Sequence, residues 1–145
     1  MKLLQRKIDK ILRDWKQTEN KMPLIVKGAR QIGKTASIMQ FATENYKNVI
    51  AINFVLQKKY KAIFDDSYEV EDIVRNITLI DPSLNFEAGN TLIFFDELQD
   101  CPACATSLKA FCIDGRFDVI CSGSLMGINY REIESNSVGY KQDYT

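Results

Sequence analysis

The chain has 145 residues, enough for one domain with a buried core. Its 46% hydrophobic and 26% charged residues are ordinary for a globular protein, and no apolar run approaches the ~20 residues of a membrane span. The N-terminus lacks the apolar core of a signal peptide, so we expect a cytoplasmic protein with no membrane partner. Residues 1–30 carry nine Lys or Arg against three acidic residues, which leaves −6 on the remainder of a chain with net charge zero.

The first predicted element is an amphipathic helix within residues 1–20. Its apolar stripe is formed by residues Leu4, Ile8, Ile11, Leu12 and Trp15. The many basic residues indicate either a face that binds nucleic acid, such as DNA, or an ordinary solvated face. Because aromatic and basic residues do not alternate here as in base-stacking proteins, the solvated face is the favoured interpretation.

A phosphate-binding loop follows the first predicted strand, a short β-branched run at residues 24–26. The loop fits the pattern G-x-x-x-x-G-K-[ST], and the expected nucleotide-binding residues are Gly28, Ala29, Arg30, Gln31, Ile32, Gly33, Lys34, Thr35 and Ala36. Glycine lets the backbone curl around a phosphate, and the N-terminus of the next helix attracts the anion. We expect Lys34 to reach the β- and γ-phosphates and the Thr35 hydroxyl to bind Mg²⁺.

The next predicted elements alternate between helix and strand. Apolar spacing predicts a helix over residues 34–46, a strand over 48–54 and a short helical turn over 60–64. Asp66 and Glu69 match a capping box that opens a further helix.

Two acidic residues end the hydrophobic strand predicted over residues 91–97. Asp96 follows four apolar residues, as in a Walker B strand, and a carboxylate there can hold the Mg²⁺ bound to a nucleotide. Glu97 is then positioned to deprotonate the attacking water as a general base. Without the phosphate loop, the acidic pair would be read equally well as a solvated strand end.

A last helix and strand complete the pattern. Pro102 fits the first turn of a helix that stops at Gly115, and the strand over residues 117–123 ends in small polar residues. Ser122 is the preferred candidate, ahead of Ser124, for sensing the γ-phosphate; the alternative is a simple turn. Alternating helices and hydrophobic strands predict an α/β fold with a mainly parallel sheet between helical layers.

The four cysteines do not form a complete metal-binding motif in the sequence. Cys101 and Cys104 form a C-x-x-C motif, which would be half of a zinc site or a redox pair, but Cys112 and Cys121 stand isolated. The chain contains no histidine, which excludes His-dependent triads within it.

With these residues identified, the chain resembles a family of bacterial and archaeal AAA-type P-loop ATPases related to the STAND and archaeal-ATPase groups. The shared segments lie at residues 28–35, 52–54, 62–64, 94–99, 107–111 and 122–127. The resemblance implies an ATP-binding core with sheet order 5-1-4-3-2 and a preference for ATP. Members of the family continue into a lid and a C-terminal domain, so we expect residues 1–145 to be an ATP-binding domain that stops within its fifth strand, with an exposed edge prone to self-association.

The leading functional hypothesis is a Mg²⁺-dependent ATPase whose nucleotide state drives a conformational change in a partner or a further domain. Lys34, Glu97 and Ser122 are its expected catalytic residues, and Thr35 and Asp96 its expected metal ligands. Two alternatives remain: a P-loop kinase that phosphorylates a small molecule, and a nucleotide-gated module that binds nucleic acid. No arginine can be assigned as an arginine finger from the sequence.

Overall fold

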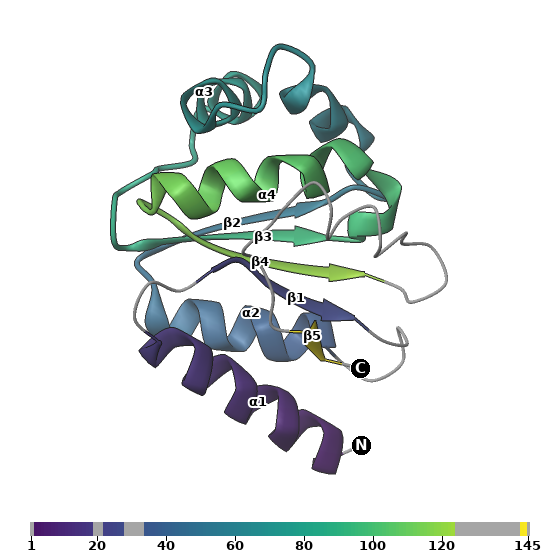
Figure 1. Cartoon of the computed structure of the whole chain (residues 1–145), viewed down its shortest axis with the longest axis vertical. Helices are drawn as coiled ribbons and strands as arrows, with labels where there is room; N and C mark the ends of the chain where they lie inside the picture. The colour runs from purple at the N-terminus through teal and green to yellow at the C-terminus, as the bar shows by residue number, and fades with distance from the viewer. Residues whose placement is uncertain (1, 19–21, 28–33, 124–142, 145) are drawn as a thin grey trace.

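The computed structural model describes residues 2–18, 22–27, 34–123 and 143–144. Within these residues, one parallel sheet has the strand order β2-β3-β4-β1-β5 (Figure 1). The elements in chain order are α1 (Lys2–Gln17), β1 (Leu24–Lys27), α2 (Lys34–Asn45), β2 (Asn48–Asn53), η2 (Lys58–Phe64), α3 (Val70–Ile80), β3 (Thr91–Asp96), η3 (Leu98–Asp100), α4 (Pro102–Asp114), β4 (Asp118–Gly123) and β5 (Asp143–Tyr144). The expected α/β fold and its strand order are confirmed.

The sheet is buried on both faces because successive residues of each central strand point to opposite sides. In β3, Phe94 packs with α1 and α2 on one side, whereas Phe95 packs with η2, α3 and α4 on the other. In β4, Ile120 and Cys121 divide between the same two cores. Figure 1 shows the resulting three layers, with α1 and α2 on one face and α3 and α4 on the opposite face.

Aromatic side chains join α1, α2 and the sheet. Trp15 lies 6.4 Å from Phe41, which lies 6.0 Å from Tyr46, measured between ring centroids. The Tyr46 hydroxyl donates a hydrogen bond to Asp118 at the start of β4. Burial and this hydrogen bond raise the pKa of Tyr46 well above its ordinary range, so the phenol stays neutral and tethers α2 to β4.

The α4 helix has the terminal residues that its sequence predicts. Pro102 occupies its first turn, where a missing N–H costs no helical hydrogen bond. Gly115 adopts φ 73° beyond its last turn, and its N–H donates to the Phe111 carbonyl. Glycine reaches this left-handed conformation without the steric cost that a side chain would add.

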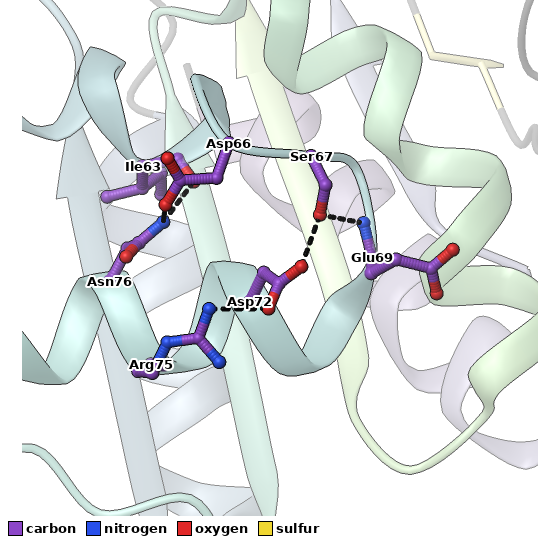
Figure 2. Close-up of polar contacts among 7 residues, drawn as sticks. All are labelled: Ile63, Asp66, Ser67, Glu69, Asp72, Arg75 and Asn76. Carbon is purple, nitrogen blue, oxygen red and sulfur yellow. Dashed lines mark hydrogen bonds and ion pairs between the residues drawn. The ribbon is translucent and has the colours of Figure 1, made fainter.

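The start of α3 differs from the predicted capping box. The helix begins at Val70, so Glu69 is its N-cap residue, and the Glu69 side chain makes no capping hydrogen bond. Figure 2 shows Ser67 in the bridging position instead: its hydroxyl accepts the N–H of Glu69 at 3.1 Å and donates to Asp72 at 2.6 Å. Asp66 accepts a hydrogen bond from Asn76. A hydroxyl both donates and accepts, so it links an N–H to a carboxylate, which Asp66 cannot do.

Other boundaries shift by one to three residues. The leading helix spans Lys2–Gln17, and β2 and β3 end one residue before their expected ends, at Asn53 and Asp96. Across the described parts of the chain, no helix combines the length and apolar character needed to span a membrane.

Candidate functional site

Parallel strands bring their carboxyl ends to one edge of the sheet, and three polar residues meet there. Asn53, the last residue of β2, is paired in register with Asp96, the last residue of β3. Phe95 is paired with Cys121, so Ser122 follows beside Asp96 on β4. On the other side of β4, Ser122 is paired with Val26 of β1, the strand that leads into the phosphate loop.

The Asp96 carboxylate is the centre of this cluster. Its Oδ1 accepts hydrogen bonds from the Ser122 hydroxyl at 2.6 Å and from the Glu97 N–H at 2.9 Å. Its Oδ2 accepts from the Thr35 hydroxyl at 3.1 Å and approaches the Asn53 side-chain nitrogen at 3.5 Å. Donors from α2, β2 and β4 therefore fix the orientation of one carboxylate at the edge of the sheet.

Lys34 reaches the same edge from the first residue of α2. Its side chain is only 4% exposed, and Nζ donates to the Gly123 carbonyl at 2.9 Å. Burying an ammonium group is unfavourable unless nearby groups compensate its charge. An anion bound at this edge would add a charge-assisted hydrogen bond to Nζ.

Thr35 and Asp96 fit the ligand preferences of Mg²⁺. Their facing oxygens are 3.1 Å apart, close to the separation of about 3.0 Å between adjacent ligands of an octahedral Mg²⁺ with ~2.1 Å bonds. While donating to Asp96, the Thr35 hydroxyl keeps lone pairs for a cation. The described residues hold no group of three or more Cys, Asp or Glu side chains suited to a metal, but Mg²⁺ at a nucleotide typically uses one or two protein carboxylates with waters and phosphates.

Glu97 leaves the strand in an unusual conformation. Its backbone has φ 61° and ψ 50°, the left-handed region, and no other residue except glycine in the described part of the chain has positive φ. The turn changes the direction of the chain directly after Asp96, and η3 begins at Leu98. The Gln99 side-chain nitrogen then donates to Glu97 Oε1 at 3.0 Å.

A cavity of about 260 Å³ opens beside this cluster. Its lining includes Thr35, Asn53 and Asp96, and Met39, Ala51 and Phe94 supply apolar walls. The cavity lies on the α2 side of the sheet, where Ala51 of the edge strand β2 is exposed. It leaves space next to the carboxylate for a further group.

Comparison with known proteins agrees with this geometry. A family model described as an AAA domain matches residues 20–145, which is most of the chain. The chain belongs to the AAA domain family. The AAA-type P-loop ATPase core expected from the sequence is therefore confirmed.

Two solved structures match the chain at low sequence identity. The structure of the Aeropyrum pernix ORC1 protein in complex with DNA matches with a TM-score of 0.54 and 14% identity, over 99% of this chain and 44% of that one. C. elegans PCH-2 matches with a TM-score of 0.49 and 13% identity, over 97% of this chain and 39% of that one. The AAA domain thus spans less than half the length of either protein. No curated protein matches the sequence.

The structure brings together some of the predicted site residues of the AAA domain, and others lie outside the described residues. Lys34, Thr35, Asp96 and Ser122 converge, and Glu97 is adjacent in sequence to Asp96. Ala36 is exposed in the first turn of α2. The residues not described are Gly28, Ala29, Arg30, Gln31, Ile32, Gly33 and Ser124.

Asn53 and Gln99 were not predicted as site residues. Asn53 is a polar residue at the end of a strand, the same signal that identified Asp96 and Ser122. Gln99 has no such signal, because its contact depends on the turn conformation of Glu97. Two arginines interact away from this cluster: Arg75 with Asp72, and Arg116 with Glu71 and Asp114.

The thiols lie in the core of the AAA domain. Cys121 is isolated in the sequence, but in the fold its side chain contacts Cys104, and both are fully buried. Packing of α4 on β4 brings the two together in one core, which sequence spacing does not reveal. Burial raises the pKa of the Cys101 and Cys104 thiols above their ordinary range, which disfavours the reactive thiolate.

The described outer face of α1 carries charges of both signs. Asp9, Lys10, Arg13 and Asp14 are all exposed. Among these residues, Lys10 and Arg13 each have an acidic neighbour in sequence, Asp9 and Asp14.

Proposed function

We propose that this AAA domain binds ATP with Mg²⁺, hydrolyses it, and passes the change of nucleotide state to a partner or a further domain. The observation that carries the proposal is the convergence of Lys34, Thr35 and Asp96 from two elements onto one edge of the sheet. The phosphate loop in the sequence, residues 28–35, joins β1 to α2 at that edge. The family supports ATP as the nucleotide.

In this proposal each residue has a separate task. The Lys34 ammonium binds the β- and γ-phosphates, and the N–H groups of the loop surround them. Thr35 and Asp96 hold Mg²⁺, which neutralises charge on the phosphates when bound. The Ser122 hydroxyl, which donates to Asp96, keeps that carboxylate oriented, and this positioning role stands beside the predicted γ-phosphate sensing.

Glu97 favours hydrolysis over transfer to another acceptor. Glu97 follows directly after Asp96, the proposed metal ligand, and in this proposal its carboxylate lies close to the γ-phosphate. A carboxylate there accepts the proton of an attacking water, the general-base role. A kinase would instead need an acceptor molecule at this position.

The first test measures ATP binding and phosphate release with Mg²⁺ and no acceptor present. We expect Lys34→Ala to lose ATP binding and Glu97→Gln to bind ATP normally while losing about 10²–10⁴-fold in kcat. The Glu97→Gln change preserves size and removes the base.

Three results would count against the proposal. Unchanged ATP binding by Lys34→Ala would remove the assigned phosphate site. Normal turnover by Glu97→Gln would remove Glu97 as the base. Phosphate transfer that requires an added acceptor would favour the kinase.

A further inference from the structure

We propose that Gln99 is a positioning residue that holds the Glu97 carboxylate in place for its reaction with water. This inference rests on the proposed hydrolysis and concerns the geometry of the same site. The direct observation is the hydrogen bond from the Gln99 side-chain nitrogen to Glu97 Oε1, 3.0 Å long. Both side chains are partly buried, so the contact is shielded from much of the competing water.

The turn that carries Gln99 is anchored in the core. Leu98 before it is 1% exposed, and Cys101 after it is 4% exposed; both belong to the core between the sheet and α4. The Asp100 N–H donates to the Glu97 carbonyl and the Cys101 N–H to the Leu98 carbonyl, each at 3.0 Å. Two buried neighbours and two backbone hydrogen bonds therefore fix the position from which Gln99 reaches Glu97.

The backbone of Glu97 explains why such support is needed. Its left-handed conformation ends the extended backbone of β3, and the N–H of the same residue donates to the Asp96 carboxylate. A glutamate side chain has several rotatable bonds, and a fixed backbone alone leaves its carboxylate free to take many positions. The Gln99 hydrogen bond selects one of them.

The neutral amide suits this task. A lysine or arginine at this place would pair with the carboxylate and oppose its uptake of a proton. An amide N–H donates a hydrogen bond to the carboxylate without adding charge, and the second N–H and the carbonyl oxygen allow contacts to other groups. Gln99 thus orients Glu97 while leaving the carboxylate available as a base.

The experiment measures kcat, KM and ATP affinity for Gln99→Ala and Gln99→Met. Methionine keeps nearly the same length and volume and lacks the donor. A misplaced catalytic group costs up to about 10²-fold in rate, so we expect kcat to fall about 10- to 100-fold, with ATP affinity and KM within about twofold of the wild type. Thermal unfolding of each variant shows whether it is folded.

The chain offers a matched control and a second readout. Gln40 donates to Glu44 at 3.4 Å on the exposed surface of α2, so Gln40→Ala removes the same kind of pair away from the site and should leave kcat unchanged. When Gln99→Ala is added to Glu97→Gln, we expect less than about a twofold further loss, because the residue through which Gln99 acts is already disabled.

The outcomes separate this inference from the proposed function. Normal kcat in both Gln99 variants, or the same loss in the Glu97→Gln background, would overturn the role of Gln99 alone. A higher kcat in both variants would show that the contact restrains Glu97, which also overturns it. If the wild type releases no more phosphate than Lys34→Ala, the proposed hydrolysis fails and this inference fails with it.

Discussion

At Glu97, the backbone stores strain at the proposed general base. A left-handed conformation costs an ordinary residue roughly 1–2 kcal/mol because its Cβ crowds the following carbonyl, and glycine avoids that cost. Such strain persists only where surrounding contacts maintain it, here the hydrogen bonds of Asp96 and η3. We expect Glu97→Gly to be more stable than Glu97→Ala by about 1 kcal/mol, measured by urea unfolding.

An ordinary helical position should give the opposite order. Lys109 is exposed within α4, and glycine there is less stable than alanine by about 0.5–1 kcal/mol. The comparison of Gly with Ala at both positions therefore removes effects of side-chain loss. The same order at positions 97 and 109 would contradict the strain at Glu97.

Individual site residues differed in how far the sequence predicted them. Lys34, Thr35 and Asp96 belong to patterns in which residue type and spacing follow from phosphate and metal chemistry, and the structure places them together. The conformation of Glu97 was not predictable, because its sequence neighbours do not require positive φ. The Gln99 contact depends on that conformation and was missed for the same reason.

Among the elements, the N-terminus of α3 depends on a small polar network (Figure 2). Hydrogen bonds from Ser67 and then Arg75 lower the pKa of the Asp72 carboxyl below its ordinary range. A carboxyl with a lowered pKa contributes stability above its unfolded pKa and loses it as the pH falls through its folded pKa. We therefore expect Asp72→Asn to be less stable than the wild type at pH 7, with the difference shrinking as the pH falls through the folded pKa of Asp72.

Urea unfolding at pH 7, 5, 4 and 3 measures this difference. Asp65→Asn, at an exposed aspartate of the preceding segment, controls for the change in net charge. A constant difference between Asp72→Asn and the wild type across this pH range would show that packing, and not the charge of Asp72, stabilises the turn.

The sequence predicted the elements better than their ends. The interior hydrophobic strands and the helices with three- and four-residue spacing form as expected, because each buries an apolar face against the sheet. The capping box predicted at the start of α3 was wrong, because Ser67 and not Asp66 accepts the N–H of Glu69. Asp66 instead accepts a hydrogen bond from Asn76, which only the folded chain brings near it. The strand order came from resemblance, since local patterns do not specify which strands pair.

In the whole molecule, the sheet separates two cores, and the thiols report on one of them. Cys101, Cys104 and Cys121 are buried in the core beneath α4, whereas Cys112 is half-buried. A thiol reagent should modify Cys112 in the folded protein and the other three only when that core opens. The rates at which Cys101, Cys104 and Cys121 react therefore measure the population of molecules in which this core is open.

ATP binding should slow those three reactions. A ligand that binds only the folded state at 100 times its Kd stabilises it by about 2.7 kcal/mol, which lowers the opened population about 100-fold. We expect Mg²⁺ and ATP to slow modification of Cys101, Cys104 and Cys121 by about this factor, while Cys112 reacts unchanged and serves as the internal control. The rates are measured with a chromogenic disulfide and peptide mass analysis. Lys34→Ala should show no protection; equal protection in that variant would mean that ATP stabilises the domain from a different site.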